Sequence, residues 1–476
     1  MSHKISVELS HSTCNHDTLI LESSGYVSKV DYTRPAEQQR AAATTAQGRI
    51  NSNPKGKRKR GVENAPEFLL SELFPAPLVL PGDDLALDPQ YPSQSLRSWV
   101  REKERNKVTS ERNTVYVAAS PEVGADVNFI RAWSEVQQQD NENHPPYPTQ
   151  PQVQDVVDYL SAFYYGLPVK KLSAKLHFTS WDDGHSKTKK AKTRASTPNF
   201  IGLNTSLECV RIRTRPSRDD IFPRQLNLDD LLDAAISVLP DDAYALLMLV
   251  QHDLFEEEDD LFVCGRAYGG SRVAVISTAR YNPELDSVQD VERDHAWPAS
   301  HCEEYLQERC ASTSKQIGRP KKKTKTSAAA SDKHNSSFSI SMDGITISPL
   351  QAAVSAHRAL PSLIEAPSTA ALSGLWLGRV CRTSSHELGH CFGMDHCVYY
   401  ACSMQGSASL TEDARQPPYL CPVDLAKMLR ATGADAGDRL EALLAFCGHR
   451  DHEDVHLFKA FAAWIRCRLA IMKNLD

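Results

Sequence analysis

The sequence lacks any hydrophobic run long enough to cross a membrane and any recognisable export signal. A membrane-spanning helix needs about eighteen or more consecutive apolar residues, and no such run occurs among the 476 residues. Residues 1–20 do not show the basic segment followed by an apolar one that marks a secretory signal peptide. Hydrophobic residues make up 41% of the chain, enough to bury one large core or two smaller ones. We therefore expect a soluble monomer inside the cell, in the cytoplasm or the nucleus, with no membrane partner.

The chain also lacks an overall positive charge. With 54 basic and 60 acidic residues its formal net charge is −6, which excludes a protein that binds nucleic acid over its whole surface. Two local runs are nevertheless strongly basic: Lys-Gly-Lys-Arg-Lys-Arg at 55–60 and Gly-Arg-Pro-Lys-Lys-Lys-Thr-Lys at 318–325. The second contains the Gly-Arg-Pro core of an AT-hook, a pattern too short to indicate DNA binding by itself. We expect both runs to be solvated linkers, with nuclear import signals as the alternative, and we do not expect nucleic acid as a partner.

The twelve cysteines do not form the regular framework of a disulfide-rich secreted domain. Three of them cluster at spacings typical of metal ligands and most others are isolated, which indicates a reducing compartment. No functional role is expected for Cys14, Cys209, Cys264, Cys302, Cys310, Cys381, Cys391 and Cys467.

Residues 386–396 read His-Glu-Leu-Gly-His-Cys-Phe-Gly-Met-Asp-His, which contains the zinc-protease motif HExxH extended to HExxHxxGxxH. His386 and His390 are four residues apart, so on a helix both imidazoles reach the same metal ion. Gly393 can adopt a left-handed backbone, end the helix and return the chain so that His396 approaches the same ion. A helix that carries its histidines by accident would give no role to Gly393 or His396.

Three protein ligands leave one coordination position of a zinc ion open. A water molecule in that position becomes acidic enough to lose a proton near neutral pH. Glu387 lies next to both helical histidines, where its carboxylate can take that proton as the water attacks a carbonyl carbon. The pattern therefore predicts zinc-dependent hydrolysis with Glu387 as the general base.

A second HExxH occurs at residues 452–456, but it lacks further ligands. No histidine follows at the required spacing, and no glutamate occurs after Glu453. We expect a helix over residues 451–470 whose apolar stripe faces the core and whose opposite, solvated face carries His452 and His456. This motif is therefore not expected to bind zinc.

Cys397, Cys402 and Cys421 follow the first motif at short spacings. Thiolates arranged in this way favour a second, structural zinc that holds the loop after the helix in place.

Together these motifs resemble the archaemetzincin family. Its members carry HExxHxxGxxxC, a second cysteine five residues on, a methionine two residues beyond it, and a CxxC pair about seventeen residues later. The resemblance implies a metzincin-like α/β fold, with a mixed sheet and an active-site helix, and a peptidase activity on peptides or proteins. It also implies roles for single residues: catalytic zinc ligands at His386, His390 and His396, a general base at Glu387, a methionine beneath the metal at Met404, and structural zinc ligands at Cys397, Cys402 and Cys421.

The chain departs from the family pattern at the last position of the CxxC pair, which is Asp424. Aspartate binds zinc through oxygen and carries the same charge as a thiolate, so Asp424 can complete the site. Cys447 with His449, a water molecule, or the absence of a second metal are the alternatives. In the last case the three cysteines would be ordinary buried thiols.

Composition divides the chain into three regions. Residues 1–65 are polar and are expected to be a disordered tail, 66–200 an accessory N-terminal region, and 201–476 the catalytic domain. Low-complexity inserts are expected at about 303–345, at 137–152 and at 186–198, all as surface loops.

Periodicity predicts the main elements of both ordered regions. Helices are expected at 153–165, 226–239, 425–429 and 440–446, and strands at 114–118, 207–214, 244–251, 262–267 and 272–278. Residues 262–270 are a candidate edge strand beside the cleft, where unpaired backbone groups could hold an extended peptide substrate. A buried hairpin is the alternative.

Three functions remain possible. The leading one is a zinc peptidase, with aminopeptidase or endopeptidase action left open. The others are a zinc-stabilised protein without catalysis and a nuclear interaction protein that uses the basic runs.

Overall fold

The computed structural model describes residues 14–50, 73–136, 147–181, 198–316, 340–342 and 345–475. The two basic runs at 55–60 and 318–325 lie outside these ranges, as does most of the inserts expected at 137–152 and 186–198. No described helix is both long enough and apolar enough to cross a membrane.

A five-stranded mixed sheet forms the centre of the fold. Its strands, in spatial order, are β10 (Gly265–Tyr268), β11 (Val273–Ser277), β8 (Ala243–Val250), β1 (Thr114–Ala118) and β3 (Val169–Lys171). The pairs β11–β8, β8–β1 and β1–β3 are parallel, and only β10–β11 is antiparallel. Among the described residues β10 pairs with β11 alone, so Gly265–Tyr268 of the expected segment is an edge strand, and it forms a hairpin with the buried β11. Its place beside a cleft stays a prediction.

The two faces of this sheet bury different cores. Successive side chains of a strand point to opposite faces. Along β8, Leu247 and Leu249 join the larger core with the C-terminal helices, whereas Leu246 and Met248 join the smaller core with the second sheet. Since both faces are covered, all eight residues of β8 are buried, as its unbroken apolar sequence requires.

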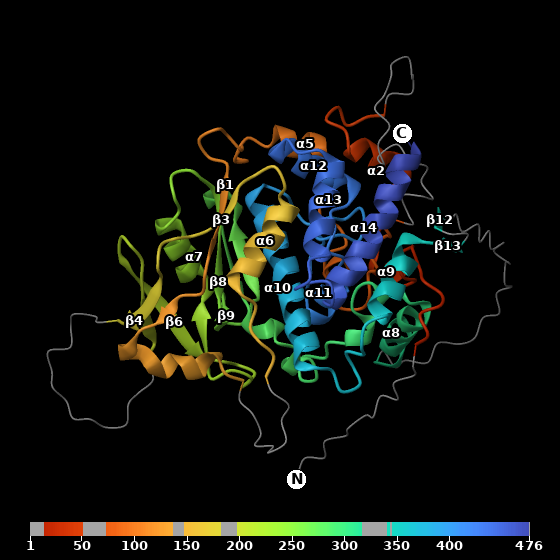
Figure 1. Ribbon diagram of the computed structural model, residues 1–476. Helices are drawn as coiled ribbons and strands as arrows, with labels where there is room; N and C mark the ends of the chain where they lie inside the picture. The colour runs from red at the N-terminus through yellow and green to blue at the C-terminus, as the bar shows by residue number, and fades with distance from the viewer. Residues whose placement is uncertain are drawn as a thin grey trace, which may run out of the picture.

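A second sheet and one helix cover the face that carries the smaller core. The sheet has six strands, in the order β2 (Glu122–Val123), β4 (His177–Ser180), β5 (Phe200–Asn204), β6 (Cys209–Pro216), β7 (Arg224–Asn227) and β9 (Asp253–Phe255). Helix α7 (Leu228–Ser237) packs on β11, β8 and β6. Figure 1 shows both sheets on one side of the molecule.

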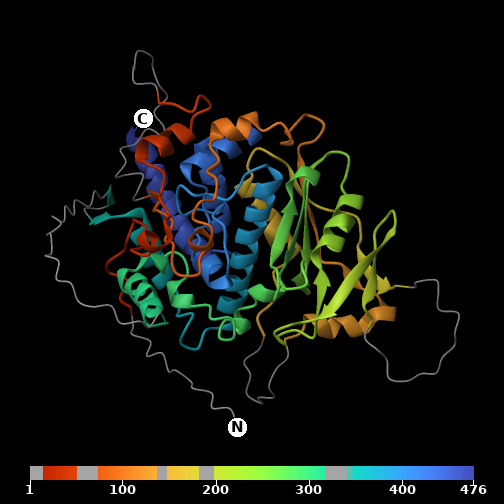
Figure 2. The same ribbon diagram turned by 180° about the vertical axis from the view of Figure 1, so that it is seen from behind.

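Helices cover the other face. They are α6 (Val153–Phe163), α9 (Pro349–Arg358), α10 (Thr369–Cys391), α11 (Leu410–Arg415), α12 (Pro422–Thr432), α13 (Ala436–Cys447) and α14 (His456–Leu475). The longest, α10, packs on β10, β11 and β8 and on α6 and α14, so it lies between the central sheet and the helical half. Figures 1 and 2 show it in this position from both sides.

The expected disordered tail is wrong for residues 14–50. This segment contains α1 (Val27–Val30) and α2 (Glu37–Ala43), and it packs on the helical half. Tyr32 is 6% exposed, and its hydroxyl donates to the carbonyl oxygen of Val398 at 2.8 Å. The segment is ordered by contacts with residues more than three hundred positions away. Its own composition gives no sign of these contacts.

The expected boundary near residue 200 does not separate two independent units. Strand β1, from the accessory region, pairs with β8 and with β3 in the central sheet, and β4 pairs with β5 in the second sheet. Two short helices of the same region, α4 (Asp84–Leu87) and α5 (Leu96–Arg101), follow the N-terminal segment. Parallel pairing joins strands that are distant in sequence, so composition could not show that they share one sheet.

The insert expected at about 303–345 begins with a helix. Helix α8 spans Glu303–Gln316, and Tyr305 and Leu306 on it are buried. The short strands β12 (Ile340–Met342) and β13 (Ile345–Ile347) form a separate hairpin. The low average hydropathy of the insert gave no indication that these two apolar side chains are buried.

The second HExxH motif differs from its expectation in burial. Helix α14 begins only at His456, and His452 and His456 are 6% and 4% exposed rather than solvated. His452 Nδ1 donates to the carbonyl oxygen of Phe446 at 3.2 Å, and His456 Nε2 to that of Pro361 at 2.8 Å. Both therefore have structural partners, and neither belongs to a described cluster of metal-type ligands.

Candidate metal centres

Helix α10 holds the first motif in a rigid, buried position. Its N-cap Ser368 accepts a hydrogen bond from the Ala371 amide, and Trp376 Nε1 donates to the carbonyl oxygen of Thr278 at the end of β11. Gly378 faces α14 so closely that a Cβ there would lie 3.0 Å from Leu457. The N-cap, the contact with the end of β11 and the contact with α14 therefore fix the helix that carries His386, Glu387 and His390.

The turn after α10 brings the third histidine back. Gly393 has φ +73°, a left-handed conformation, and the Met394 amide donates to the carbonyl oxygen of Gly389 at 3.1 Å. The chain then reverses and carries His396 toward the helix. The expectation that Gly393 ends the helix agrees with this geometry.

The three imidazole rings of His386, His390 and His396 converge. Their ring centroids are 4.8, 5.0 and 5.3 Å apart, and one ligand atom from each lies within 4.8 Å of the other two. Nε2 of His386 and Nε2 of His390 are 3.1 Å apart. A zinc ion bonded to nitrogen at about 2.0–2.1 Å fits among three donors at this spacing.

Hydrogen bonds on the far side of two rings determine which nitrogen is free. Nδ1 of His386 donates to the carbonyl oxygen of Ser403, and Nδ1 of His390 to that of Met394, both at 2.7 Å. With Nδ1 protonated, the Nε2 lone pair of each ring faces the centre, as in most metal-binding histidines. Burial lowers the pKa of all three histidines, that of His390 to about 4, so the rings are neutral and able to bind a cation.

Two residues from the N-terminal half lie beside His396, and sequence reasoning missed both. Asp84 Oδ2, on α4, is 4.0 Å from His396 Nδ1, and the Tyr91 ring is 5.6 Å from the imidazole. A carboxylate near the outer nitrogen of a ligand histidine orients the ring and makes it a stronger donor. No spacing rule connects residue 84 with residue 396, so the sequence carried no signal for this contact.

Glu387 is only 9% exposed. Burial raises the pKa of its carboxyl to about 8, and the positive charge of Arg266 on β10 acts against that rise. Arg266 itself pairs with Glu256. A carboxyl whose pKa lies near neutral both accepts and returns a proton at physiological pH.

Met404 lies beneath the histidines. It is fully buried, and a Cβ on Gly389 would approach its Sδ closely and lie 2.9 Å from its Cε. Gly389 therefore lets the methionine pack directly on α10 between the two helical histidines.

Cys397, Cys402, Cys421 and Asp424 form a second cluster, in which every side chain is at most 3% exposed. Sγ of Cys397 and Sγ of Cys421 are 3.6 Å apart. Oδ2 of Asp424 lies 3.2 Å from Cys421 Sγ and 3.5 Å from Cys402 Sγ. Among the described residues, neither Cys447 nor His449 joins this group.

The electrostatics of this cluster oppose its fully ionised form unless a cation is present. Burial raises the pKa of the Cys402 and Cys421 thiols well above the ordinary range and that of Asp424 to about 6. Burial opposes the charged form of Cys397 as well, but hydrogen bonds from the neighbouring thiols bring its pKa below the ordinary value. Lys427 donates to Asp424 Oδ1 at 2.8 Å, which leaves Oδ2 directed at the sulfur atoms. One ammonium cannot balance three thiolates and a carboxylate, whereas a divalent metal ion would.

Gln94 connects the two clusters. Its side chain donates to the carbonyl oxygen of Gly393 at 2.9 Å and accepts from the Asp395 amide, in the turn that carries His396. The same Oε1 accepts from Lys427, the partner of Asp424. The accessory region thus braces both clusters with a single side chain.

The edge strand lies beside the histidines. Helix α10 packs on β10. A Cβ on Gly269, just after β10, would lie 2.6 Å from the carbonyl oxygen of His390. The strand β10 therefore lies beside the helix that carries His386 and His390.

Comparison with known proteins gives consistent matches. Residues 344–430 match the family model "Peptidase family M54". Archaemetzincin-2 of Homo sapiens is 27% identical over 268 residues, which cover 52% of this chain and 59% of that protein. Archaemetzincin-1 of Rattus norvegicus is 27% identical over 253 residues, covering 51% of this chain and 39% of that protein. The chain thus spans less than two thirds of either relative.

A solved structure is also similar, at a greater distance. The crystal structure of archaemetzincin from Methanopyrus kandleri is 16% identical, covers 69% of this chain and 99% of its own, and superposes with a TM-score of 0.30.

Proposed function

The chain belongs to the archaemetzincin family, and from this we propose that it is a zinc-dependent peptidase whose reaction takes place at His386, His390 and His396. The observation that carries the proposal is the convergence of three neutral imidazoles beside a buried carboxyl. A purely structural zinc site has four protein ligands and no adjacent acid. The described cluster has three histidines and Glu387 beside them.

The metal and the chain divide the chemistry. Zinc, when bound, supplies the Lewis acidity that makes a water molecule a strong nucleophile near neutral pH. Glu387 accepts the proton of that water as it attacks the peptide carbonyl carbon, and then returns it to the departing amine. Burial raises the pKa of this carboxyl, which favours holding the proton between the two transfers.

The chain's other groups position these parts. The carbonyl oxygens of Ser403 and Met394 accept from the helical imidazoles, and the Asp84 carboxylate lies 4.0 Å from Nδ1 of His396. We propose that an extended peptide binds along the open side of β10, adding a strand to the central sheet. A peptide bound in this way would have its scissile carbonyl beside the histidines. The proposal leaves the choice between aminopeptidase and endopeptidase action open.

We assign the Cys397, Cys402, Cys421 and Asp424 cluster to a second, structural zinc. Support comes from their spacing, from complete burial and from the excess of negative charge that a thiolate form would create. Such an ion contributes folding free energy directly, so Cys421→Ser should chiefly destabilise the fold.

The substitution Glu387→Gln tests the mechanism. It removes the base but no metal ligand, so we expect unchanged zinc content and at least a hundredfold lower hydrolysis of a peptide library followed by mass spectrometry. Glu453→Gln is a matched control, because Glu453 is the exposed glutamate of the second HExxH. It should keep full activity. Full activity in Glu387→Gln would refute the mechanism, and lost zinc would show that Glu387 is a ligand.

A zinc-stabilised protein without catalysis is the alternative, and an inactive wild type with full zinc content would favour it. The nuclear interaction function depended on basic runs outside the described residues and stays a prediction, as does location in the cytoplasm or nucleus.

A further inference from the structure

We propose that Cys14, His16 and His295, with Cys302 as fourth ligand, form an additional zinc site in the reduced chain. The site is remote in sequence from both clusters described above. It would fasten the N-terminal segment 14–50 to the body of the protein.

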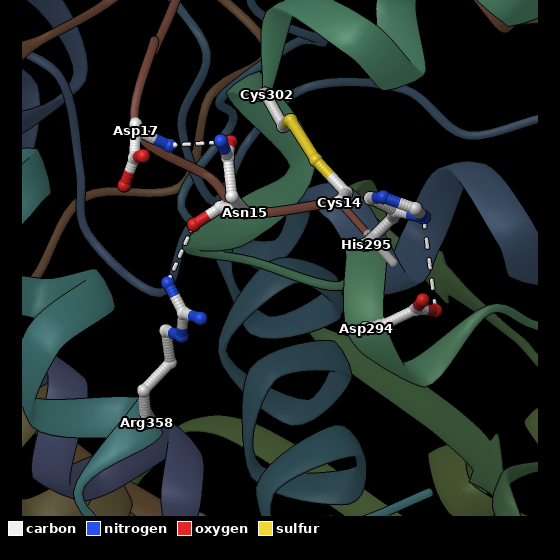
Figure 3. Close-up of a disulfide and its surroundings, with 7 residues drawn as sticks. All are labelled: Cys14, Asn15, Asp17, Asp294, His295, Cys302 and Arg358. Carbon is white, nitrogen blue, oxygen red and sulfur yellow. Dashed lines mark hydrogen bonds and ion pairs between the residues drawn. A yellow bond between two sulfur atoms is a disulfide. The ribbon is translucent and has the colours of Figure 1, made fainter. Parts of the chain in front are cut away.

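The donor atoms already lie together. Cys14 Sγ and one nitrogen each of His16 and His295 lie within 4.8 Å of one another, and Cys14 forms a second such group with Cys302 and Glu304. The two imidazole centroids are 5.5 Å apart. In the structure Cys14 and Cys302 are joined as a disulfide, with His295 directly beside it (Figure 3). Two cysteines and two histidines are a ligand set typical of structural zinc.

The histidine nitrogens face this centre without partners. Among the described residues, neither ring nitrogen of His16 has a hydrogen-bond partner, nor does Nε2 of His295, although all three atoms are buried. Nδ1 of His295 lies 3.6 Å from the Asp294 carboxylate, as Figure 3 shows. A carboxylate on one nitrogen and a free lone pair on the other is the arrangement of metal-binding histidines. Buried polar atoms normally find partners, so three orphaned nitrogens call for an explanation.

Backbone contacts assemble the site independently of any sulfur bond. The Ile20 amide donates to the carbonyl oxygen of His301 at 2.7 Å, and the Glu303 amide to that of Thr18 at 2.9 Å. Arg358 donates to the carbonyl oxygen of Asn15 at 2.6 Å (Figure 3). The segment that bears Cys14 and His16 is therefore held beside Cys302 even when the thiols are free.

The separation of the two cysteines suits a bridging ion. Their Cα atoms are 7.7 Å apart, beyond the range of about 4.4–6.8 Å that most disulfides occupy. A zinc ion bonded to each sulfur at about 2.3 Å spans a wider gap than a direct bond does.

The disulfide and the metal site are alternative states. A thiol reductant breaks the Cys14–Cys302 bond by delivering two electrons and two protons, and two reductant thiols become their own disulfide. Zinc binding then displaces the two thiol protons. The expected reducing compartment favours the metal-binding state.

The surroundings give a zinc ion access to the cluster and partly balance its charge. A cavity of about 330 Å³ borders the cluster and is lined by Cys14, His16, Asp294 and Arg358, among others. Asp17 and Asp294 favour a cation here, whereas Arg358 and Arg309 act against it. Burial and the neighbouring imidazole keep His16 neutral by lowering its pKa.

The consequence concerns the loop of the second cluster. The fastened segment continues to Tyr32 and Arg34, which donate to the carbonyl oxygens of Val398 and Tyr399, directly after Cys397. Loss of zinc at the proposed site should therefore loosen the cover of that loop.

Zinc per chain, measured by elemental mass spectrometry on protein kept reduced, tests the proposal. His16→Ala removes a proposed ligand but spares both cysteines, so it separates a metal site from a disulfide. We expect His16→Ala and His295→Ala each to hold one zinc fewer than wild type, and His177→Ala, at an exposed and remote histidine, to hold the same number. Equal zinc in wild type, His16→Ala and His295→Ala would overturn the proposal.

A labelling measurement follows the two cysteines directly and gives a second readout. After reduction and removal of metal, we expect added zinc to slow alkylation of Cys14 and Cys302 at least tenfold in wild type but not in His16→Ala. Equal alkylation rates with and without zinc would overturn the proposal. Neither readout uses peptidase activity, so failure here is distinguishable from failure of the proposed function.

Discussion

At the scale of single residues, the chemistry of this chain depends on which ring nitrogen of each histidine is engaged. In His386 and His390 a carbonyl oxygen takes Nδ1, and Nε2 is left for a metal ion. His252 has the opposite pattern and no metal-type neighbours among the described residues: its Nε2 donates to the carbonyl oxygen of Ile130 at 3.1 Å. The first two histidines are therefore arranged as metal ligands, whereas the third has a structural hydrogen bond.

His252 should make the fold sensitive to acid. Burial lowers its pKa to about 4, whereas an unfolded chain titrates near 6.5. As pH falls below 6.5 the unfolded state binds a proton that the folded state does not bind. The free energy of unfolding therefore decreases between about pH 6.5 and pH 4.

The measurement is the free energy of unfolding in urea at pH 7.5 and pH 5. Wild type should lose about 2 kcal/mol more over this interval than His252→Gln, whose amide can still donate to Ile130. An identical loss in both proteins would show that His252 does not titrate in this way.

At the scale of elements, the site depends on α10 and the two segments that contact its end. The turn 393–396 returns the third histidine, and the loop bearing Met404 packs under Gly389. Gln94 and Trp99 attach the accessory region to the same end, Trp99 by donating to the carbonyl oxygen of Phe392 at 2.9 Å. The histidine geometry is thus set by several elements at once.

Gly389→Ala should disturb this packing. The new methyl group would lie 2.9 Å from Met404 Cε, so the methionine must shift away from the helix. We expect a loss of about 1–3 kcal/mol in unfolding free energy and a lower kcat. Gly25→Ala is a suitable control, because nothing lies within 4 Å of a Cβ there. Unchanged stability and activity in Gly389→Ala would show that the methionine does not support the site.

At the scale of the whole molecule, sequence reasoning succeeded where the signal is local. His386, His390 and His396 lie within eleven residues, and the unbroken apolar run of β8 also shows in a short window. Contacts across the chain had no such signal. Asp84 and Gln94 meet residues 396 and 393, and Cys14 meets Cys302, at separations that only the folded chain defines. The burial of His456 was misjudged for the same reason, since its partner Pro361 is 95 residues away, whereas His452 bonds to the nearby Phe446.

The central claim is that His386, His390 and His396 bind a zinc ion on which hydrolysis depends. The most direct test is zinc per chain together with peptide hydrolysis, in wild type and in His390→Ala, both purified without added metal and kept reduced. We predict that His390→Ala holds one zinc fewer, keeps the remaining zinc and loses hydrolysis. Equal zinc content in the two proteins, or hydrolysis that survives the loss of the ion, would contradict the account.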